Sequence, residues 1–257
     1  MKALKLHVGF VYLFLYAPIT VLVLFSFNKD KRNVNWSGFT LEWYQKLLTN
    51  EGLHRALWNS LKVGLLATLC AAVLGTLTAL ALTRYRFRGR SMVTALVFLP
   101  MAIPEIVMGT SLLTFFVGLG TQMSIATVVI SHIAFCVGYC TATIRSRLQG
   151  SNFDVEEAAA DLGATPWACF WLVTFPRILP AILSGCMLAF TLSFDDFVVT
   201  FFTAGIGAGT LPLKIYSMVK FGVTPEINAI STLTLLITLS ALMLSQWSSM
   251  RNPDSSK

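Results

Sequence analysis

The sequence predicts an all-helical protein that crosses a membrane several times. Of its 257 residues, 55% are hydrophobic and only 12% are charged, and the mean hydropathy is +0.70. A soluble domain carries about 25% charged residues, so too few charges remain here to cover a water-facing surface. The apolar residues also form continuous runs of about 20, which suits membrane helices and not the alternating strands of a barrel.

Six such runs predict six transmembrane helices in one membrane domain, residues 1–257. They lie near residues 8–27, 58–83, 92–118, 124–144, 179–203 and 228–248. The first run follows Lys2 and Lys5, as in a signal peptide, but no A-x-A cleavage site precedes Asn28. We therefore expect this run to be retained as the first span.

The distribution of arginine predicts the orientation of these spans. The stretch RYRFRGR, residues 84–90, places four arginines between the second and third spans. Short basic connections stay on the cytoplasmic side, so this one should be cytoplasmic. With six spans, both termini and the segment 145–178 are then cytoplasmic as well. The net charge of +7 indicates contact with anionic lipid headgroups and not with nucleic acid.

The predicted outer connection, residues 28–57, is rich in aromatic side chains. It contains Trp36, Phe39, Trp43 and Tyr44. Aromatic residues gather at the headgroup level of membranes, which is the interpretation we favour. A surface for an external partner is the alternative.

The common catalytic motifs are missing from the sequence. It contains no G-x-x-x-x-G-K-[ST] nucleotide loop, no G-x-S-x-G elbow and no H-E-x-x-H pair. We expect no enzyme activity and no cofactor, and any ATP hydrolysis would take place on another chain. The five cysteines contain no C-x-x-C pair, which argues against a disulfide framework or a zinc ribbon.

Two sets of residues are spaced four apart along helices. His132, Cys136 and Cys140 lie near one face of the fourth span, where a soft-metal site is conceivable. No second group of ligands accompanies them, so buried packing is favoured and no metal is expected. In the second span the small residues Ala67, Ala71, Gly75 and Ala79 should let two helices approach closely.

Three acidic residues interrupt the apolar runs: Glu105, Asp195 and Asp196. An ionisable group inside a membrane marks a functional site by default, although a helix end in contact with water would also accommodate one. Pro100 and Pro104 can kink or break the helix before Glu105. Straight helices would place Glu105 and Asp195 at similar depth in the outer half of the membrane. Asp195 and Asp196 are about 100° apart on the helix, so they cannot both face a pore in the same way. At least one of them, with Glu105 next, is the candidate to meet a solute, and a carboxylate would suit a cation.

A polar segment, EEAAADLGATPWACFWLVTFP, begins at Glu156 and separates the fourth and fifth spans. Its start favours a helix, which should end at Gly163 because glycine adopts positive φ readily. Thr165 can cap a second helix with Pro166 at its first position. The spacing leaves two interpretations open: a helical hairpin that docks on a partner, and an amphipathic segment lying on the headgroups.

This segment resembles the cytoplasmic signature of permease subunits of binding-protein-dependent ABC importers, E-A-A-x3-G-x9-I-x-L-P. The residues that match it at the required spacing are Glu157, Ala158, Ala159, Gly163 and Pro176. Val173 and Phe175 replace its Ile and Leu and keep their apolar character. The resemblance implies the type I ABC importer permease fold. It also implies that the segment is a coupling helix that fits a groove on an ATPase subunit.

Four longer stretches resemble the second permease subunit of spermidine/putrescine importers. They are LYAPITVLVLFSFN, LPMAIPEIVMGTSLL, FTLSFDDFVVTFFTAG and LPLKIYSMVKFGVTPEINA. The resemblance implies a polyamine importer of the bacterial inner membrane, with a second permease subunit, an ATPase dimer and a periplasmic polyamine-binding protein. An importer for another small solute is an alternative. A proton-coupled transporter that uses the intramembrane acids is another, but it leaves the E-A-A segment unexplained.

Overall fold

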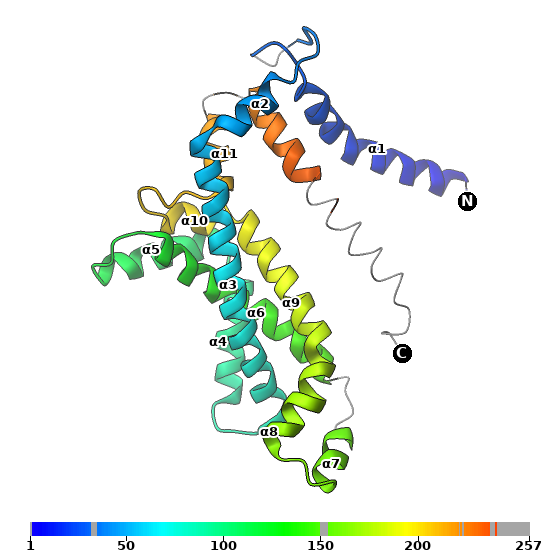
Figure 1. Ribbon diagram of the computed structural model, residues 1–257, viewed down its shortest axis with the longest axis vertical. Coiled ribbons are helices and arrows are strands. Elements are labelled where there is room, and N and C mark those ends of the chain that lie inside the picture. Colours follow the sequence, from blue (N-terminus) through cyan, green and yellow to red (C-terminus); the bar gives the residue numbers. More distant parts are fainter. Residues whose placement is uncertain are drawn as a thin grey trace. The chain divides into compact units, whose positions relative to one another are not determined.

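The computed structural model describes residues 2–31, 35–149, 154–220, 222, 224–236 and 240. These residues form helices joined by turns, with an isolated antiparallel bridge between Asn28 and Phe39 (Figure 1). The chain divides into two compact units. Unit 1 comprises Met1–Leu53 and Ile215–Lys257, and unit 2 comprises His54–Lys214.

Unit 1 is built around a polar turn that follows the first helix. Its elements are α1 (Lys2–Phe25), α2 (Glu42–Thr49), the start of α3 (Glu51–Arg84), most of α11 (Leu211–Lys220) and a helix at 225–236. The Asn28 side chain binds the backbone of Asn35 and Ser37, and its carbonyl accepts a 2.8 Å hydrogen bond from Trp43 Nε1. Trp43 is buried by this contact. Trp43 therefore stabilises the loop, and its side chain is available neither to the lipid headgroups nor to an external partner.

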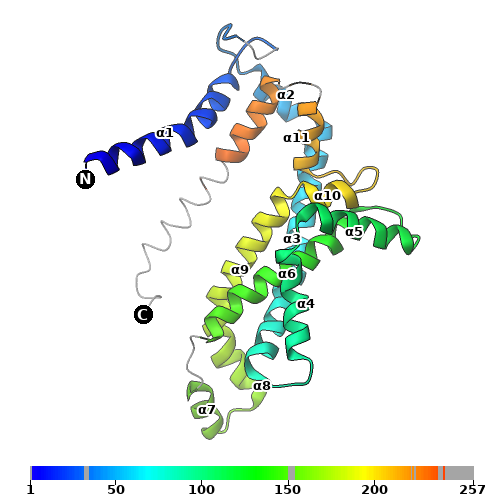
Figure 2. The same ribbon diagram turned by 180° about the vertical axis from the view of Figure 1, so that it is seen from behind.

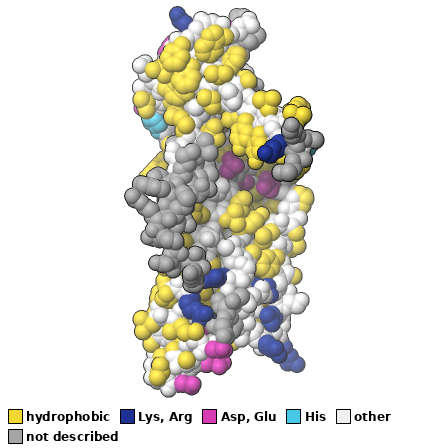
Figure 3. All heavy atoms as spheres, turned by 90° about the vertical axis from the view of Figure 1, so that its right-hand side faces the viewer, with side chains coloured by type: hydrophobic (Ala, Val, Ile, Leu, Met, Phe, Trp, Pro, Cys, Tyr) yellow, Lys and Arg dark blue, Asp and Glu magenta, His cyan; other side chains and the backbone are white. Residues whose placement is uncertain are grey.

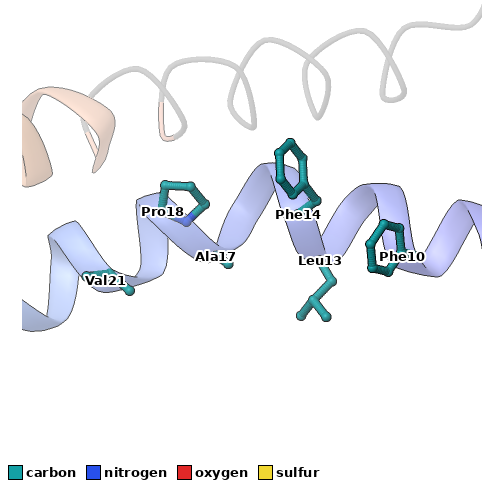
Figure 4. A pocket seen from close by; sticks show the side chains of 6 residues that line it. All are labelled: Phe10, Leu13, Phe14, Ala17, Pro18 and Val21. Atoms are coloured by element: carbon teal, nitrogen blue, oxygen red, sulfur yellow. The ribbon is translucent and has the colours of Figure 1, made fainter.

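A groove of about 620 Å³ runs along one face of α1. All of its lining residues come from this helix: Phe10, Leu13, Phe14, Ala17, Pro18 and Val21 (Figure 4). The lining contains no polar side chain, and α1 is exposed along its length. This surface suits hydrocarbon and offers nothing that would hold a polar solute.

Unit 2 contains most of the helices. They are the rest of α3, α4 (Arg90–Ala102), α5 (Glu105–Gly118), α6 (Ile125–Gln149), α7 (Asp154–Asp161), α8 (Pro166–Cys169), the π-helical turn η1 (Phe170–Thr174), α9 (Phe175–Asp195) and α10 (Val198–Thr203). Helix α6 is central and packs against α9, α4 and α10, while α5 packs on α10. Helix α7 lies at one end of the unit and α5 with α10 at the other (Figures 1 and 2).

Within the described residues, four helices are long and apolar enough to cross a membrane: Leu4–Phe25, Glu51–Arg84, Ile125–Gln149 and Pro166–Asp195. The pair α4 and α5 would provide a fifth span, with a bend of 112° between them. The predicted sixth span, 228–248, lies only partly within the described residues, of which 225–236 are helical.

Two predicted spans differ from the helices observed. The run 92–118 is not one straight helix, because Pro104 lacks the N–H that would continue α4. The run 179–203 has different ends, since its helix begins at Pro166 and stops at Asp195. Pro176 does not interrupt this helix because the π-helical turn before it shifts the hydrogen bonds, and the Phe175 N–H donates to Phe170 O.

The small residues of the second predicted span pack α3 tightly against α6. Ala67, Ala71 and Ala79 are fully buried. A Cβ added at Gly75 would lie only 2.6 Å from Cβ of Cys140, so a larger residue would force the helices apart. The prediction of close helix packing along this stripe is confirmed.

The arginine-rich connection is a tight turn at the end of α3. Gly89 adopts a φ of 88°, and Arg90 Nη2 donates a 2.6 Å hydrogen bond to Leu82 O. A cation at the carboxyl end of a helix suits the helix dipole. Lys and Arg side chains gather toward the end of unit 2 that carries α7 (Figure 3).

Candidate functional site

Two helices of unit 2 break at one place. The first break separates α4 from α5 at Ile103 and Pro104, and the second separates α9 from α10 at Asp196. The two outer pieces, α5 and α10, pack closely, because a Cβ added at Gly109 would lie 2.6 Å from Phe202 Cδ2. In membranes, broken helices are tolerated where their backbone lines a cavity, which is the situation here.

The breaks line a cavity of about 480 Å³. Its wall contains all three predicted substrate-path acids, Glu105, Asp195 and Asp196. The apolar part of the wall includes Met101, Met108, Phe135, Tyr139 and Phe197. The structure thus brings together three acids that are up to 91 residues apart in the sequence.

Among the residues that the structure describes, the carboxylates of Glu105 and Asp195 have no protein partner. Both side chains are exposed, and within the part of the chain that the structure describes neither makes a hydrogen bond or an ion pair. Glu105 occupies the first turn of α5, where a negative charge suits the helix dipole. Both carboxylates are therefore available to a cationic solute.

Asp196 differs from its neighbour because its carboxylate is engaged by the protein. Its side chain is only 5% exposed. It accepts hydrogen bonds from the backbone N–H groups of Val199 and Thr200, and it lies 3.2 Å from Nε2 of His132. Asp196 therefore caps α10 and bridges helices, whereas Asp195 is exposed. The two aspartates differ more in environment than a rotation of about 100° on one helix would predict.

His132 was not among the predicted site residues. It is fully buried, and its ring contacts α9 and α10. The buried packing favoured for this face of α6 is confirmed, and Sγ of Cys136 and Cys140 contacts the α9 carbonyls of Ala189 and Gly185. The described residues hold no group of three or more His, Cys, Asp or Glu that could bind a metal.

The polar segment forms the predicted helix, glycine turn and second helix. Gly163 has a φ of 88°, its N–H donates to Ala160 O, and the next N–H donates to Ala159 O. These two bonds define a Schellman motif. Thr165 caps the next helix by accepting from the N–H of Ala168, and Pro166 follows the cap.

Glu156 ties α7 to the ends of two other helices. Its Oε1 lies 2.5 Å from Arg84 Nη2 and accepts a 2.8 Å hydrogen bond from Thr174 Oγ1. Arg84 Nη2 also donates to Thr174, which completes a triangle of contacts. Sequence reasoning missed Glu156 because it lies just before the signature, and its partners are distant in the chain.

The outer face of this segment is exposed and partly apolar. Leu162, Trp167 and Leu172 are 90%, 72% and 78% exposed. Of the signature residues, Glu157, Ala158, Gly163 and Pro176 are exposed and Ala159 is half-buried. An apolar surface of this kind, flanked by polar residues, is typical of a protein contact.

Membrane-length helices, a polar cavity at two helix breaks and an exposed helical hairpin define a multi-pass membrane transport subunit. Residues 71–249 match the family of binding-protein-dependent transport system inner membrane components. The chain belongs to this family, whose members are transport components and not enzymes.

Similar proteins agree with this assignment. The chain is 43% identical to the spermidine/putrescine transport system permease protein PotC of Haemophilus influenzae, over 94% of each chain. It is also 43% identical to the putrescine transport system permease protein PotI of Escherichia coli, over 86% of this chain and 82% of that one. Among solved structures, a bacterial ABC transporter involved in alginate import matches with a TM-score of 0.76 at 16% identity, over 95% of this chain and 94% of that one.

Proposed function

We propose that the chain is one of two permease subunits of an ATP-driven importer of spermidine and putrescine in a bacterial inner membrane. The observation that carries the proposal is the cavity at the helix breaks, where two carboxylates have no partner within the described part of the chain. The similarity to PotC and PotI supports polyamine cargo.

The chemistry of the cavity suits a flexible diammonium ion. Glu105 and Asp195 each offer a carboxylate, the natural partner of an ammonium group in a partly dehydrated site. Helices α4 and α9 end at the cavity, and the carboxyl ends of helices carry partial negative charge. Phe135 and Tyr139 add aromatic surface that can attract a cation.

The hairpin at 154–174 is the proposed contact with the ATPase subunit. Its exposed apolar residues, Leu162, Trp167 and Leu172, offer a surface for a groove on that partner. The contacts of Glu156 with Arg84 and Thr174 would pass a movement of α7 to α3 and to the start of α9. The partners that this function requires are an ATPase dimer, a second permease subunit and a periplasmic polyamine-binding protein.

The experiment that tests this function is uptake by the reconstituted complex. Proteoliposomes that contain the permease pair and the ATPase, supplied with the binding protein, should accumulate spermidine only when ATP is present. An uncoupler should leave the rate unchanged, because no proton gradient drives the cargo. Uptake that needs no ATP and collapses with the uncoupler would identify a proton-coupled transporter instead.

The proposed topology has six spans and both termini in the cytoplasm, with the last span beginning near residue 225. Thr40→Cys and Gly89→Cys, each introduced after the native cysteines have been replaced, report on the two sides. In intact cells an impermeant thiol reagent is expected to label position 40 and not position 89, because the arginine-rich turn stays inside. Labelling of position 89 and not of position 40 would show that the proposed orientation is wrong.

A further inference from the structure

A buried polar cluster from three helices closes the break between α9 and α10. We call it the joint cluster, and it comprises His132 of α6, Ser193 of α9, Asp196 at the break and Thr200 of α10. His132 Nδ1 lies 2.7 Å from Ser193 Oγ, and Nε2 lies 3.0 Å from Thr200 Oγ1 and 3.2 Å from Asp196 Oδ2. His132 is fully buried.

The hydrogen bonds of the cluster determine which ring nitrogen of His132 donates and which one accepts. Thr200 Oγ1 donates to Asp196 Oδ2 at 2.8 Å, so its proton is committed. Nε2–H can then donate to the oxygens of Thr200 and Asp196, and the Ser193 hydroxyl donates to Nδ1. In this arrangement every polar side-chain atom of the imidazole and of the two hydroxyls has a partner, which is the condition for burying them.

This arrangement holds the carboxylate of Asp196 in contacts with the protein, although the residue lines the cavity. Its two oxygens are held by the first turn of α10 and by the imidazole. Because the backbone leaves the helix at this residue, the preceding Asp195 is the last helical residue of α9 and lies exposed at the cavity. The exposed Asp195 therefore directly precedes the residue whose contacts hold the break together.

We propose that His132 is a positioning residue for cargo recognition. Through Asp196 it locks the α9–α10 joint, so that Asp195 meets the cargo and Asp196 does not. This inference rests on the proposed function for its link to polyamines. Its structural part, the locking of the joint, can be measured separately.

The test compares replacements that differ in what they offer to Asp196. His132→Leu removes every donor at similar volume, His132→Gln keeps an amide N–H that can reach Asp196, and Thr200→Val removes only the shared hydroxyl. Since a buried carboxylate loses a partner, His132→Leu is expected to raise the KM for spermidine uptake at least about tenfold and Thr200→Val about threefold. His132→Gln should stay within about threefold of the parent because the donor remains.

A second readout reports on the joint without relying on transport. Val198→Cys places a thiol at the start of α10, on the cavity wall, in a chain without its native cysteines. His132→Leu is expected to speed its labelling by a small cationic thiol reagent at least about threefold, because the half-helix is no longer tethered. Thr141→Val is the control, since Thr141 is equally buried on α6 but does not contact the joint, and it should change neither quantity.

The outcomes separate the two proposals. If His132→Leu and Thr200→Val assemble with parental KM and labelling rates, the positioning role is wrong. It is also wrong if His132→Gln is as impaired as His132→Leu, because shape alone would then explain the effect. If His132→Leu does not assemble, Thr200→Val decides the matter, because a parental KM together with a parental labelling rate for that variant would contradict the positioning role. If spermidine fails to slow the labelling of position 198 in the parent, polyamine passage through this cavity is wrong, whatever the joint does.

Discussion

Asp195→Asn is expected to lower Vmax/KM for spermidine uptake by about 10- to 100-fold. A hydrogen bond to a charged group contributes about 1.5–3 kcal/mol, and the amide removes that charge while keeping the shape of the side chain. The Asp195 carboxylate makes no hydrogen bond or ion pair within the described residues, so its replacement should cost little stability. The measurement is uptake by the assembled complex over a range of spermidine concentrations.

Two matched variants show whether the effect belongs to the cavity. Glu42→Gln removes a negative charge from an exposed residue of α2 and should leave uptake unchanged. Glu105→Gln should impair uptake in the same direction, and the double variant should impair it further. Parental kinetics for Asp195→Asn in a fully assembled complex would exclude this carboxylate from cargo recognition.

Gly163→Val is expected to reduce the amount of ATPase that purifies with the permease at least about tenfold. At a φ of 88° a β-branched residue is strained, and such conformations cost about 1–3 kcal/mol. A Cβ at this position would meet no atom within 4 Å, so the whole penalty falls on the backbone of the turn. Relief of the strain would open the Schellman motif and reorient the exposed face that follows it.

Gly207→Val provides the control for this variant. Gly207 has a φ of 81° and the same open surroundings, but it lies in the loop after α10 and not in the hairpin. It should retain the ATPase, and Gly163→Ala should be less damaging than Gly163→Val because alanine resists positive φ less strongly. Normal assembly and uptake of the Gly163→Val complex would contradict the coupling role of this turn.

Local chemistry explains why some elements could be predicted from sequence. Gly163, Thr165 and Pro166 act within a few residues of themselves, so their spacing predicted the turn and the cap correctly. Continuous apolar runs likewise predicted helices because each run by itself has the length of a span. The break at Pro104 follows from a missing N–H, which is visible in the sequence.

Contacts between distant segments explain what could not be predicted. The π-helical turn that admits Pro176 has no sequence signal, so the sequence does not show that this helix is continuous back to Pro166. Glu156 binds Arg84, which is 72 residues away in the sequence. His132 binds Ser193, which is 61 residues away. For the same reason the sequence could not distinguish Asp195 from Asp196. The structure shows that the Asp196 carboxylate is bound by the protein and that Asp195 is exposed at the cavity.

The helix from Pro166 to Asp195 runs without a break from the hairpin to the cavity, through 30 residues and about 45 Å at 1.5 Å per residue. It packs against α6 over several turns, from the buried cluster of Ile178 with Ile144 and Leu148 to the hydrogen bond between Ser193 and His132. Within this stretch a Cβ added at Gly185 would lie 3.4 Å from Cα of Cys140. A helix supported along its side in this way behaves as a stiff rod, so a movement imposed near Trp167 would be carried along it toward Asp195. A residue larger than alanine at position 185 would disturb this packing and should alter transport while leaving both ends of the helix chemically intact.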